Sequence, residues 1–317
     1  MPVTVYFATN RVISGDPTDF SSYKDGIVSP TDPGQMTFGT AFVNDADFTN
    51  DTVGAITSIQ NISKGNFPEN AIDDLSSPGR NLLVFIHGFD NSFEDAITRA
   101  AFNQQWIADP KKPAGETTVV TFSWPSLGKL ISPPLPWDDY FHDQTAAGQS
   151  GAHLMNFFAQ LQPIINDARK NGSRCFLLAH SMGNWALQAG VESWFSHGKA
   201  PSSLFDTAFL AAADERYDTF SIPFPGRLSG LKQLTKKICI LYSREDEVLD
   251  ASKLINLGAQ RLGQDGPKDK GNAPTFPAAE YTMIDCTSFQ DYRRDFESSH
   301  QYYRRSPTAR DAIIAQI

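Results

Sequence analysis

Hydrophobic residues along the chain gather in short continuous runs, and apolar residues at helical spacing lie between several of these runs. The runs that we expect to be buried strands cover residues 81–89, 117–124, 173–181, 205–214, 236–243 and 279–287. Apolar residues recur at helical spacing in residues 92–108, 146–170 and 182–195, which predicts helices there. Continuous apolar strands that alternate with helices are typical of a parallel sheet covered on both faces. The pattern therefore predicts an α/β fold with a mostly parallel central sheet.

The first 80 residues follow a different pattern. Residues 3–9 and 36–43 are rich in β-branched and aromatic residues and are expected to be strands, whereas the polar segments between them are expected to be loops. Further along, residues 125–143, which are rich in proline, and residues 215–235 interrupt the alternation. We find neither an internal repeat nor a linker that divides the chain. We therefore expect one domain over residues 1–317, with these two segments as insertions that shape a pocket.

Composition excludes several classes of protein. The 317 residues are 40% hydrophobic and 20% charged, as in globular proteins, and the net charge of −9 argues against nucleic acid as a partner. The three cysteines, Cys175, Cys239 and Cys286, lie far apart in or beside apolar runs and are expected to be buried free thiols. No ligand spacing typical of a structural zinc site occurs, so we expect no metal.

The N-terminal segment and the hydropathy pattern bear on location. Residues 1–11 have neither the basic nor the apolar region of a signal peptide, and no apolar stretch approaches the roughly 20 residues of a membrane span. We therefore expect a cytoplasmic protein without a membrane span. The sequence carries no signal for its oligomeric state.

The sharpest chemical motif is residues 179–183, Ala-His-Ser-Met-Gly, between a predicted buried strand and a predicted helix. A G-x-S-x-G turn in this setting is a nucleophile elbow, and here alanine replaces the first glycine. Such a turn exposes the oxygen of Ser181 and directs the N–H of Met182 toward a developing oxyanion. A capping serine in an ordinary strand-to-helix turn is the alternative, but the strand and the helix on either side favour the elbow.

A second motif, His87-Gly88-Phe89-Asp90, follows an earlier predicted strand. Acyl transfer needs a second oxyanion donor from a turn of this kind, and the N–H of Phe89 is the candidate. Alone, the motif would equally fit a buried histidine and a turn glycine. Its place about ninety residues before the elbow, with one strand between, favours the catalytic interpretation.

The candidate acid lies in the acidic segment that follows residues 236–243. A catalytic acid must hold a histidine at a fixed strand end, and Asp246 fits this place best. Asp214, which also follows a buried strand, is the main alternative. Glu245, Glu247 and Asp250 are further candidates in an acidic loop.

The candidate base is His300, because it alone among the six histidines follows both Ser181 and the strand-end acids, in the order Ser, Asp, His. An exposed loop histidine is the alternative interpretation. The other histidines are expected in the oxyanion turn, facing away at the elbow, or in the insertion and on helices: His87, His180, His142, His153 and His197.

The segments VYFATNR, LLVFIHGF, VVTFSWPS, LLAHSMGN and SSHQYY, spread over residues 3–305, resemble the α/β-hydrolase superfamily. More narrowly, they resemble the bacterial esterase/lipase-like family DUF900. The resemblance implies about eight mostly parallel strands with helices on both faces. It also implies a Ser181, Asp246 and His300 triad, with the Phe89 and Met182 amides as the oxyanion hole. The segment SREDEVLD is more acidic than the usual acid-bearing loop, which leaves the choice of carboxylate open.

The motifs together predict a serine hydrolase that cleaves carboxylic esters through an acyl-enzyme, without a cofactor. Thioesterase, amidase or peptidase activity with the same triad, and a catalytically silent binding module, are the alternatives. Both insertions are expected over the carboxyl ends of the strands, where such sheets bind ligands. Their apolar residues favour a small ester substrate with an apolar group: Leu130, Ile131, Leu135, Trp137, Phe220, Ile222, Phe224 and Pro225.

Overall fold

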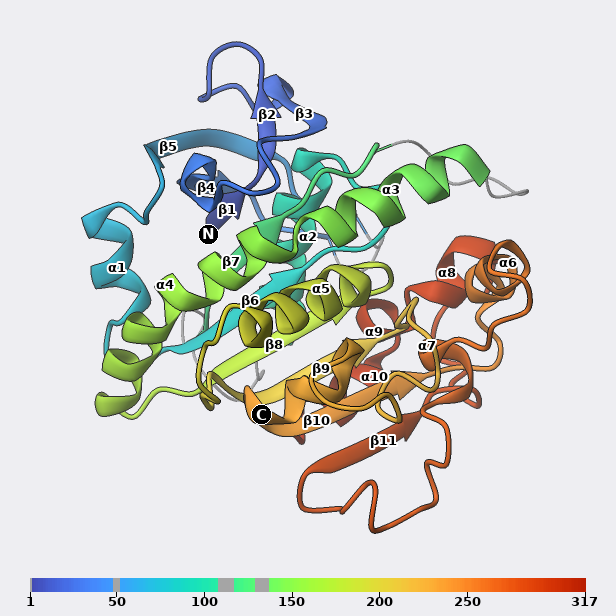
Figure 1. Cartoon of the computed structure of the whole chain (residues 1–317). Coiled ribbons are helices and arrows are strands. Elements are labelled where there is room, and N and C mark those ends of the chain that lie inside the picture. Colours follow the sequence, from blue (N-terminus) through green and yellow to red (C-terminus); the bar gives the residue numbers. More distant parts are fainter. Residues whose placement is uncertain (1, 48–51, 108–116, 129–136) are drawn as a thin grey trace.

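A computed structural model of the chain describes residues 2–47, 52–107, 117–128 and 137–317. Its main sheet has nine strands in the order β11-β10-β9-β8-β6-β7-β1-β4-β5, and β2 and β3 form a separate pair (Figure 1). The strands are β1 (Val3–Thr9), β2 (Arg11–Ile13), β3 (Tyr23–Ile27), β4 (Thr37–Val43), β5 (Ile56–Lys64), β6 (Asn81–Ile86), β7 (Thr117–Ser123), β8 (Cys175–His180), β9 (Phe205–Ala211), β10 (Thr235–Tyr242) and β11 (Tyr281–Asp285).

The sheet is parallel from β11 to β1, and only the pairings of β4 with β1 and of β4 with β5, at one edge, are antiparallel. The prediction of a mostly parallel sheet is thereby confirmed, with one strand more than the resemblance implied. The extra strand is β5, whose residues are mostly half-buried or exposed. A strand with so little buried surface lacks the continuous apolar run that marked the others, so the sequence did not indicate it.

Helices cover both faces of the sheet (Figure 1). The α-helices are α1 (Glu69–Leu75), α2 (Phe93–Trp106), α3 (Trp137–Gln149), α4 (Gly151–Lys170), α5 (Gly183–Ser196), α6 (Glu247–Ile255), α7 (Leu262–Asp265), α8 (Phe296–His300), α9 (Tyr302–Arg305) and α10 (Pro307–Ile314). The 3₁₀ helices are η1 (Phe20–Ser22), η2 (Pro33–Gln35) and η3 (Arg227–Gln233).

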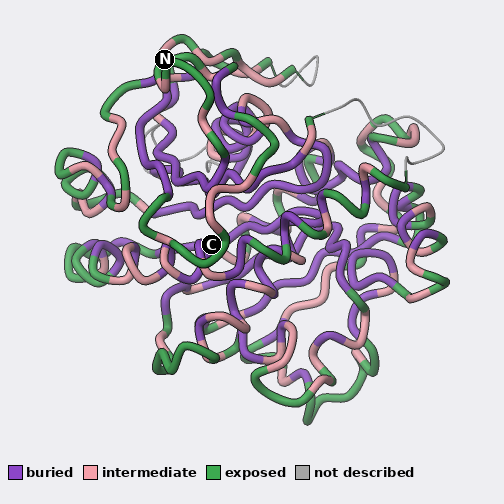
Figure 2. The backbone as a smooth tube through the Cα atoms, turned by 45° about the horizontal axis from the view of Figure 1, so that its top comes forward, coloured by how far each residue is buried: buried purple, intermediate pink, exposed green. Residues whose placement is uncertain are grey.

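The strand β6 illustrates how the core is built. Leu82, Val84 and Ile86 pack in the apolar cluster under α4 and α5. Leu83 and Phe85 point to the opposite cluster, under α2, α9 and α10. Because successive side chains of a strand point to opposite faces, both sets are apolar only in a strand that is covered twice. Figure 2 shows the buried backbone gathered in the interior, with most of the exposed backbone at the periphery.

The carboxyl ends of the parallel strands meet at one edge, on the right of Figure 1. The turn at residues 87–90 follows β6, Ser181 follows β8, Asp246 follows β10, and His300 lies beyond β11 in α8. Segments more than two hundred residues apart are therefore brought to the same edge.

The first insertion differs from its expected form. The helix α3 begins at Trp137, so the end of this insertion is helical, and a break at Ser150 separates α3 from α4. Leu130, Ile131 and Leu135 lie outside the described residues.

The second insertion takes a course that the sequence did not predict. Phe224 packs against Phe195 near the end of α5, with ring centroids 4.9 Å apart. Phe220 packs against Tyr281, the first residue of β11, at 5.9 Å. Both rings therefore lie toward the amino ends of the strands, in contrast to the expectation that they line a pocket at the carboxyl ends.

Candidate active site

The turn after β8 places Ser181 in a left-handed conformation, with a φ of 54°. A non-glycine residue in this region costs about 1–3 kcal/mol and persists only where its surroundings hold it. Here the Ser181 N–H donates to the Ala211 carbonyl at 3.0 Å, and the Asp214 N–H donates to the Ser181 carbonyl at 3.1 Å. The last residue of neighbouring β9 and the loop after it thus fix the strained residue through its N–H and its carbonyl. A strained residue at a strand-to-helix turn is typical of a nucleophile elbow.

Two glycines allow the turns after β6 and β8 to approach each other. A methyl group on Gly183 would lie 2.6 Å from the Ile86 carbonyl oxygen and would also overlap the His87 carbonyl. A methyl group on Gly88 would lie 2.7 Å from the β-carbon of Ser181. Both positions therefore require glycine for steric reasons, although neither has a positive φ.

The amides of Phe89 and Met182 both lie beside this contact. Within the described residues, neither N–H donates a hydrogen bond to the protein. The preceding carbonyl, that of Gly88, faces Nδ1 of His87 at 2.9 Å and accepts from Nδ2 of Asn91 at 3.2 Å. In a planar trans peptide the C=O and the following N–H point in opposite directions. Groups that hold the Gly88 carbonyl therefore also fix the direction of the Phe89 N–H.

His300 and Asp246 form a buried pair beside the elbow. Nδ1 of His300 lies 2.8 Å from Oδ2 of Asp246, and the two side chains are 4% and 0% exposed. The other carboxylate oxygen of Asp246 accepts the Leu249 N–H at 3.0 Å and caps α6. Burial raises the pKa of Asp246 above its usual value, and His300 opposes this shift. A carboxylate in this position can orient a histidine and stabilise its imidazolium form.

Nε2 of His300 is buried and has no hydrogen-bond partner among the described residues. A hydrogen bond between this atom and Ser181, expected for a triad, is therefore not formed in this structure. In enzymes without substrate such hydrogen bonds are often long and tighten only in the reactive complex. The free Nε2 position is the one at which a base would accept the proton of Ser181.

His180 contributes to the site in a way that sequence reasoning missed. It was expected to face away, but its ring centroid lies 4.8 Å from that of His300, and its Nε2 lies 3.2 Å from the His300 carbonyl oxygen. Burial lowers the pKa of His180 well below its usual value, and the neighbouring His300 adds to this shift. A neutral His180 therefore donates to the main chain of His300. Tyr303 also packs against His180, with ring centroids 4.6 Å apart.

Asp214, the alternative acid, lies close to the elbow, but its carboxylate is engaged elsewhere. It accepts the hydroxyls of Tyr140 at 2.9 Å and Ser252 at 2.5 Å, and it pairs with Arg261 at 3.4 Å. These contacts join α3, α6 and the end of β9. Asp214 is thus placed to hold elements together, whereas Asp246 is the carboxylate in contact with His300.

The other acidic candidates and the remaining histidines lie away from the His300 imidazole. Glu245 and Asp250 are both exposed. Glu247 is exposed as well, and its main-chain N–H donates to the Ser299 hydroxyl at 3.1 Å. His142 is half exposed on α3, His153 is buried in α4, and His197 caps the end of α5. Across residues 2–47, 52–107, 117–128 and 137–317, no cluster of three His, Cys, Asp or Glu side chains is arranged to hold a metal ion.

The parallel sheet with helices on both faces, and the strained serine at a strand-to-helix turn, define the chain as an α/β hydrolase in fold. A family model described as "Alpha/beta hydrolase of unknown function (DUF900)" matches residues 63–316. Since the match covers most of the chain, the protein belongs to this family, as its sequence motifs indicated. No curated protein and no solved structure matches the chain significantly. None of the described helices is long and apolar enough to cross a membrane.

Proposed function

We propose that the protein is a serine hydrolase that cleaves carboxylic esters through an acyl-enzyme. The observation that carries this proposal is the left-handed Ser181 at the elbow, next to the buried pair of His300 and Asp246. Backbone strain at a single polar residue is typical of functional sites. A buried carboxylate on Nδ1 leaves Nε2 of the histidine free to act as a base.

The proposed reaction has two steps. His300 takes the proton of Ser181 as the serine oxygen attacks the ester carbonyl, and Asp246 stabilises the imidazolium. The N–H groups of Phe89 and Met182 donate to the oxyanion of the tetrahedral intermediate. His300 then returns the proton to the leaving alcohol, and the serine ester remains. Water, deprotonated by His300, attacks this ester and releases the acid and the free serine.

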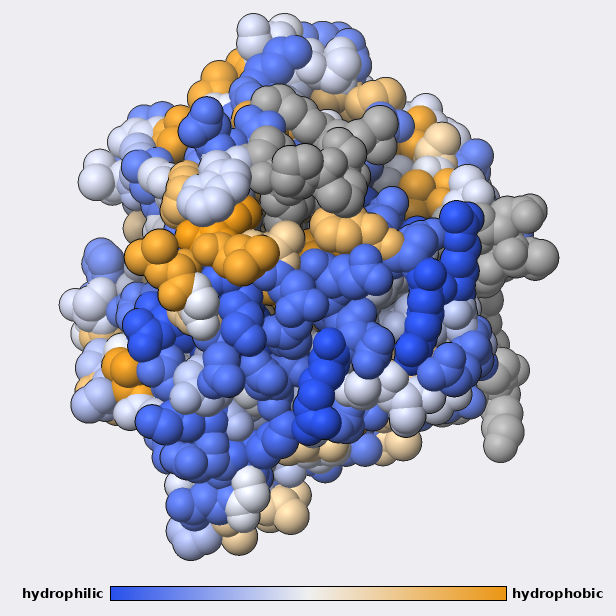
Figure 3. Space-filling model, turned by 90° about the vertical axis from the view of Figure 1, so that its right-hand side faces the viewer, coloured by the Kyte–Doolittle hydropathy of each residue, from blue (hydrophilic) through white to orange (hydrophobic). Residues whose placement is uncertain are grey.

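An apolar substrate is supported by the surface at the carboxyl edge. Trp137 and Phe141 at the start of α3, Leu254 near the end of α6, and Leu257 just beyond that end are exposed. The two helices meet where Asn256 donates to the Tyr140 hydroxyl at 2.8 Å. Figure 3, which views this side of the molecule, shows hydrophobic side chains gathered beside a largely polar surface. We therefore propose esters with an apolar acyl or alcohol group, and a cytoplasmic setting remains our expectation.

The alternative functions are hydrolysis of a different bond and a binding role without catalysis. Thioesters, amides and peptides are open to the same triad. A silent binding module would keep the fold but would not need a strained serine next to a histidine–carboxylate pair.

The test is a set of matched p-nitrophenyl esters, thioesters and anilides with apolar and charged acyl groups. We expect turnover of apolar esters by the wild type, and a loss on the order of a million-fold in kcat for Ser181→Ala. Ser196 is an exposed serine at the far end of α5, the helix that follows Ser181, so Ser196→Ala is the matched control and should keep wild-type turnover. Equal turnover of charged and apolar esters would refute the substrate preference, and full activity of Ser181→Ala would refute the function.

A further inference from the structure

Two charged side chains with no part in the proposed reaction lie buried behind the turn that carries Phe89. Arg11, the first residue of β2, is 1% exposed, and Asp143, from α3, is fully buried. Buried charges are costly unless they are paired and hydrogen-bonded. Their partners therefore indicate what these residues hold in place.

The carboxylate of Asp143 accepts hydrogen bonds from two separate loops. Its Oδ2 accepts the Asp90 N–H at 3.0 Å and the Ser126 hydroxyl at 2.5 Å. Its Oδ1 accepts the Leu127 N–H at 3.1 Å and lies 3.1 Å from Nδ1 of His142. Burial raises the pKa of Asp143, and its hydrogen bonds oppose this shift. One side chain of the first insertion thus ties together the loops after β6 and β7.

Arg11 contacts the same two loops. It donates to the Asn91 carbonyl at 2.7 Å, the Ser126 carbonyl at 3.0 Å and the Ser123 hydroxyl at 3.0 Å. The Ser126 hydroxyl in turn accepts the Asn91 N–H at 3.0 Å. Burial lowers the pKa of Arg11 to about 10, so it remains charged at neutral pH.

The backbone next to Phe89 needs such support. Asp90 follows Phe89 directly and has a φ of 58°, in the left-handed region. Its N–H, held by Asp143, fixes the peptide that leads out of Phe89. Asn91 holds the carbonyl of Gly88, and so fixes the peptide that leads into Phe89. The direction of the Phe89 N–H is thus set from both sides.

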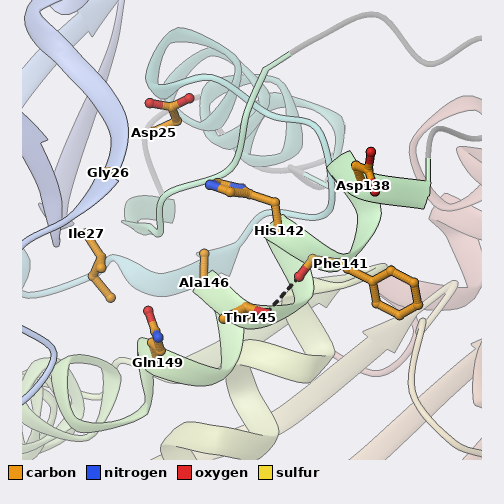
Figure 4. A pocket seen from close by; sticks show the side chains of 9 residues that line it. All are labelled: Asp25, Gly26, Ile27, Asp138, Phe141, His142, Thr145, Ala146 and Gln149. Carbon is orange, nitrogen blue, oxygen red and sulfur yellow. Dashed lines mark hydrogen bonds between the residues drawn. The ribbon is translucent and has the colours of Figure 1, made fainter.

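We propose that Asp143 is a positioning residue, which holds the Phe89 N–H in the direction needed by the oxyanion. The proposal rests on the proposed esterase function. Under this proposal, α3 both shapes the substrate pocket and supports the oxyanion turn. The outer face of this helix, with His142 and Phe141, lines a separate surface pocket of about 600 Å³ (Figure 4). The inner face carries Asp143 to the loop beside the nucleophile.

The test compares Asp143→Asn with the wild type. An amide has only one accepting oxygen, so the variant loses at least one of the bonds that Asp143 accepts. Removal of a whole oxyanion donor costs about 100- to 1000-fold in kcat, and we expect a displaced donor to cost roughly 10- to 100-fold with KM nearly unchanged. Affinity for a phenylboronic acid, which forms a tetrahedral adduct with the serine, should fall in parallel. Asp73→Asn, at an exposed position on α1, is the control and should match the wild type.

Several results would overturn the proposal. One is a folded Asp143→Asn whose kcat lies within about threefold of the wild type. Another is a kcat that is lowered only in proportion to the folded fraction measured by far-UV circular dichroism. If Asp143→Asn does not fold, Ser126→Ala decides by the same criterion, because it removes the hydroxyl between Asn91 and Asp143. A wild type without ester turnover would instead refute the proposed function, and this proposal would fall with it.

Discussion

A methyl group added at Gly88 probes the contact between the two turns of the site. Gly88→Ala adds no backbone strain, because the φ of Gly88 is not positive. The new β-carbon would lie 2.7 Å from the β-carbon of Ser181 and 3.1 Å from the His180 carbonyl oxygen. Ordinary contact begins at 3.4 Å, so the turns must separate by about 0.7 Å. Neither obstacle is the flexible end of a long side chain, and the Phe89 N–H must therefore move relative to the nucleophile.

The size of the expected effect follows from this displacement. A misplacement of about 1 Å can cost about 100-fold, so we expect kcat to fall roughly 10- to 100-fold. Overpacking should also lower the free energy of unfolding by about 1–3 kcal/mol. Turnover of p-nitrophenyl butyrate and urea denaturation measure the two effects.

Gly271→Ala is the matched control for this experiment, since a methyl group there meets nothing within 4 Å. It should leave both quantities unchanged. A folded Gly88→Ala with wild-type kcat would refute the reasoning that close approach of the two turns sets the oxyanion hole.

Two further predictions concern the titratable groups of the site. Asp246→Asn should lower kcat by about 10⁴-fold, whereas Asp214→Asn should lower it far less, and equal losses in the ester assay would contradict the choice of acid. Burial raises the pKa of Asp246, so the native state disfavours its ionised form. As the pH falls toward 3.8, the native wild type takes up this proton and should therefore gain stability relative to Asp246→Asn, whose free energy of unfolding becomes the smaller of the two by a growing margin. A difference between the two that is independent of pH would count against this shift. The pKa of His180 lies well below 6.5 in the folded state, so only the unfolded chain binds its proton in the first pH unit below that value. As the pH is lowered through this range, the free energy of unfolding of the wild type should therefore fall more steeply than that of His180→Gln, by up to about 1.4 kcal/mol per pH unit. Equal pH dependence of the two proteins in urea denaturation would contradict the burial of a neutral histidine.

The order of elements could be predicted from the sequence because the central strands are covered on both faces. Such strands are apolar at most positions, and their nearly continuous runs are visible without any tertiary information. Once the strands are parallel, their carboxyl ends share one edge. The parallel topology therefore also explains why Asp246 and His300, 54 residues apart, could be expected to meet.

The supporting residues of the site could not be predicted in the same way. Arg11 and Asp143 are charged residues, and their types alone indicate a solvated surface. Their burial depends on hydrogen bonds to distant segments, such as the one between Arg11 and Ser123, 112 residues away. The TNR and SWPS motifs contain Arg11, Ser123 and Ser126. The sequence therefore marked these residues through the family resemblance, but it gave no physical reason for their presence. The positions of Phe220 and Phe224 could not be predicted for a related reason, because aromatic composition fits the core at either edge of a sheet.

The account depends most directly on Ser181 as the nucleophile. Intact-protein mass spectrometry after treatment with a fluorophosphonate measures this, with peptide mapping of the adduct in the wild type and in Ser181→Ala. We predict a single adduct on the peptide that contains Ser181, and none in the variant. An adduct that persists in Ser181→Ala, or a folded wild type that takes up none, would contradict the account.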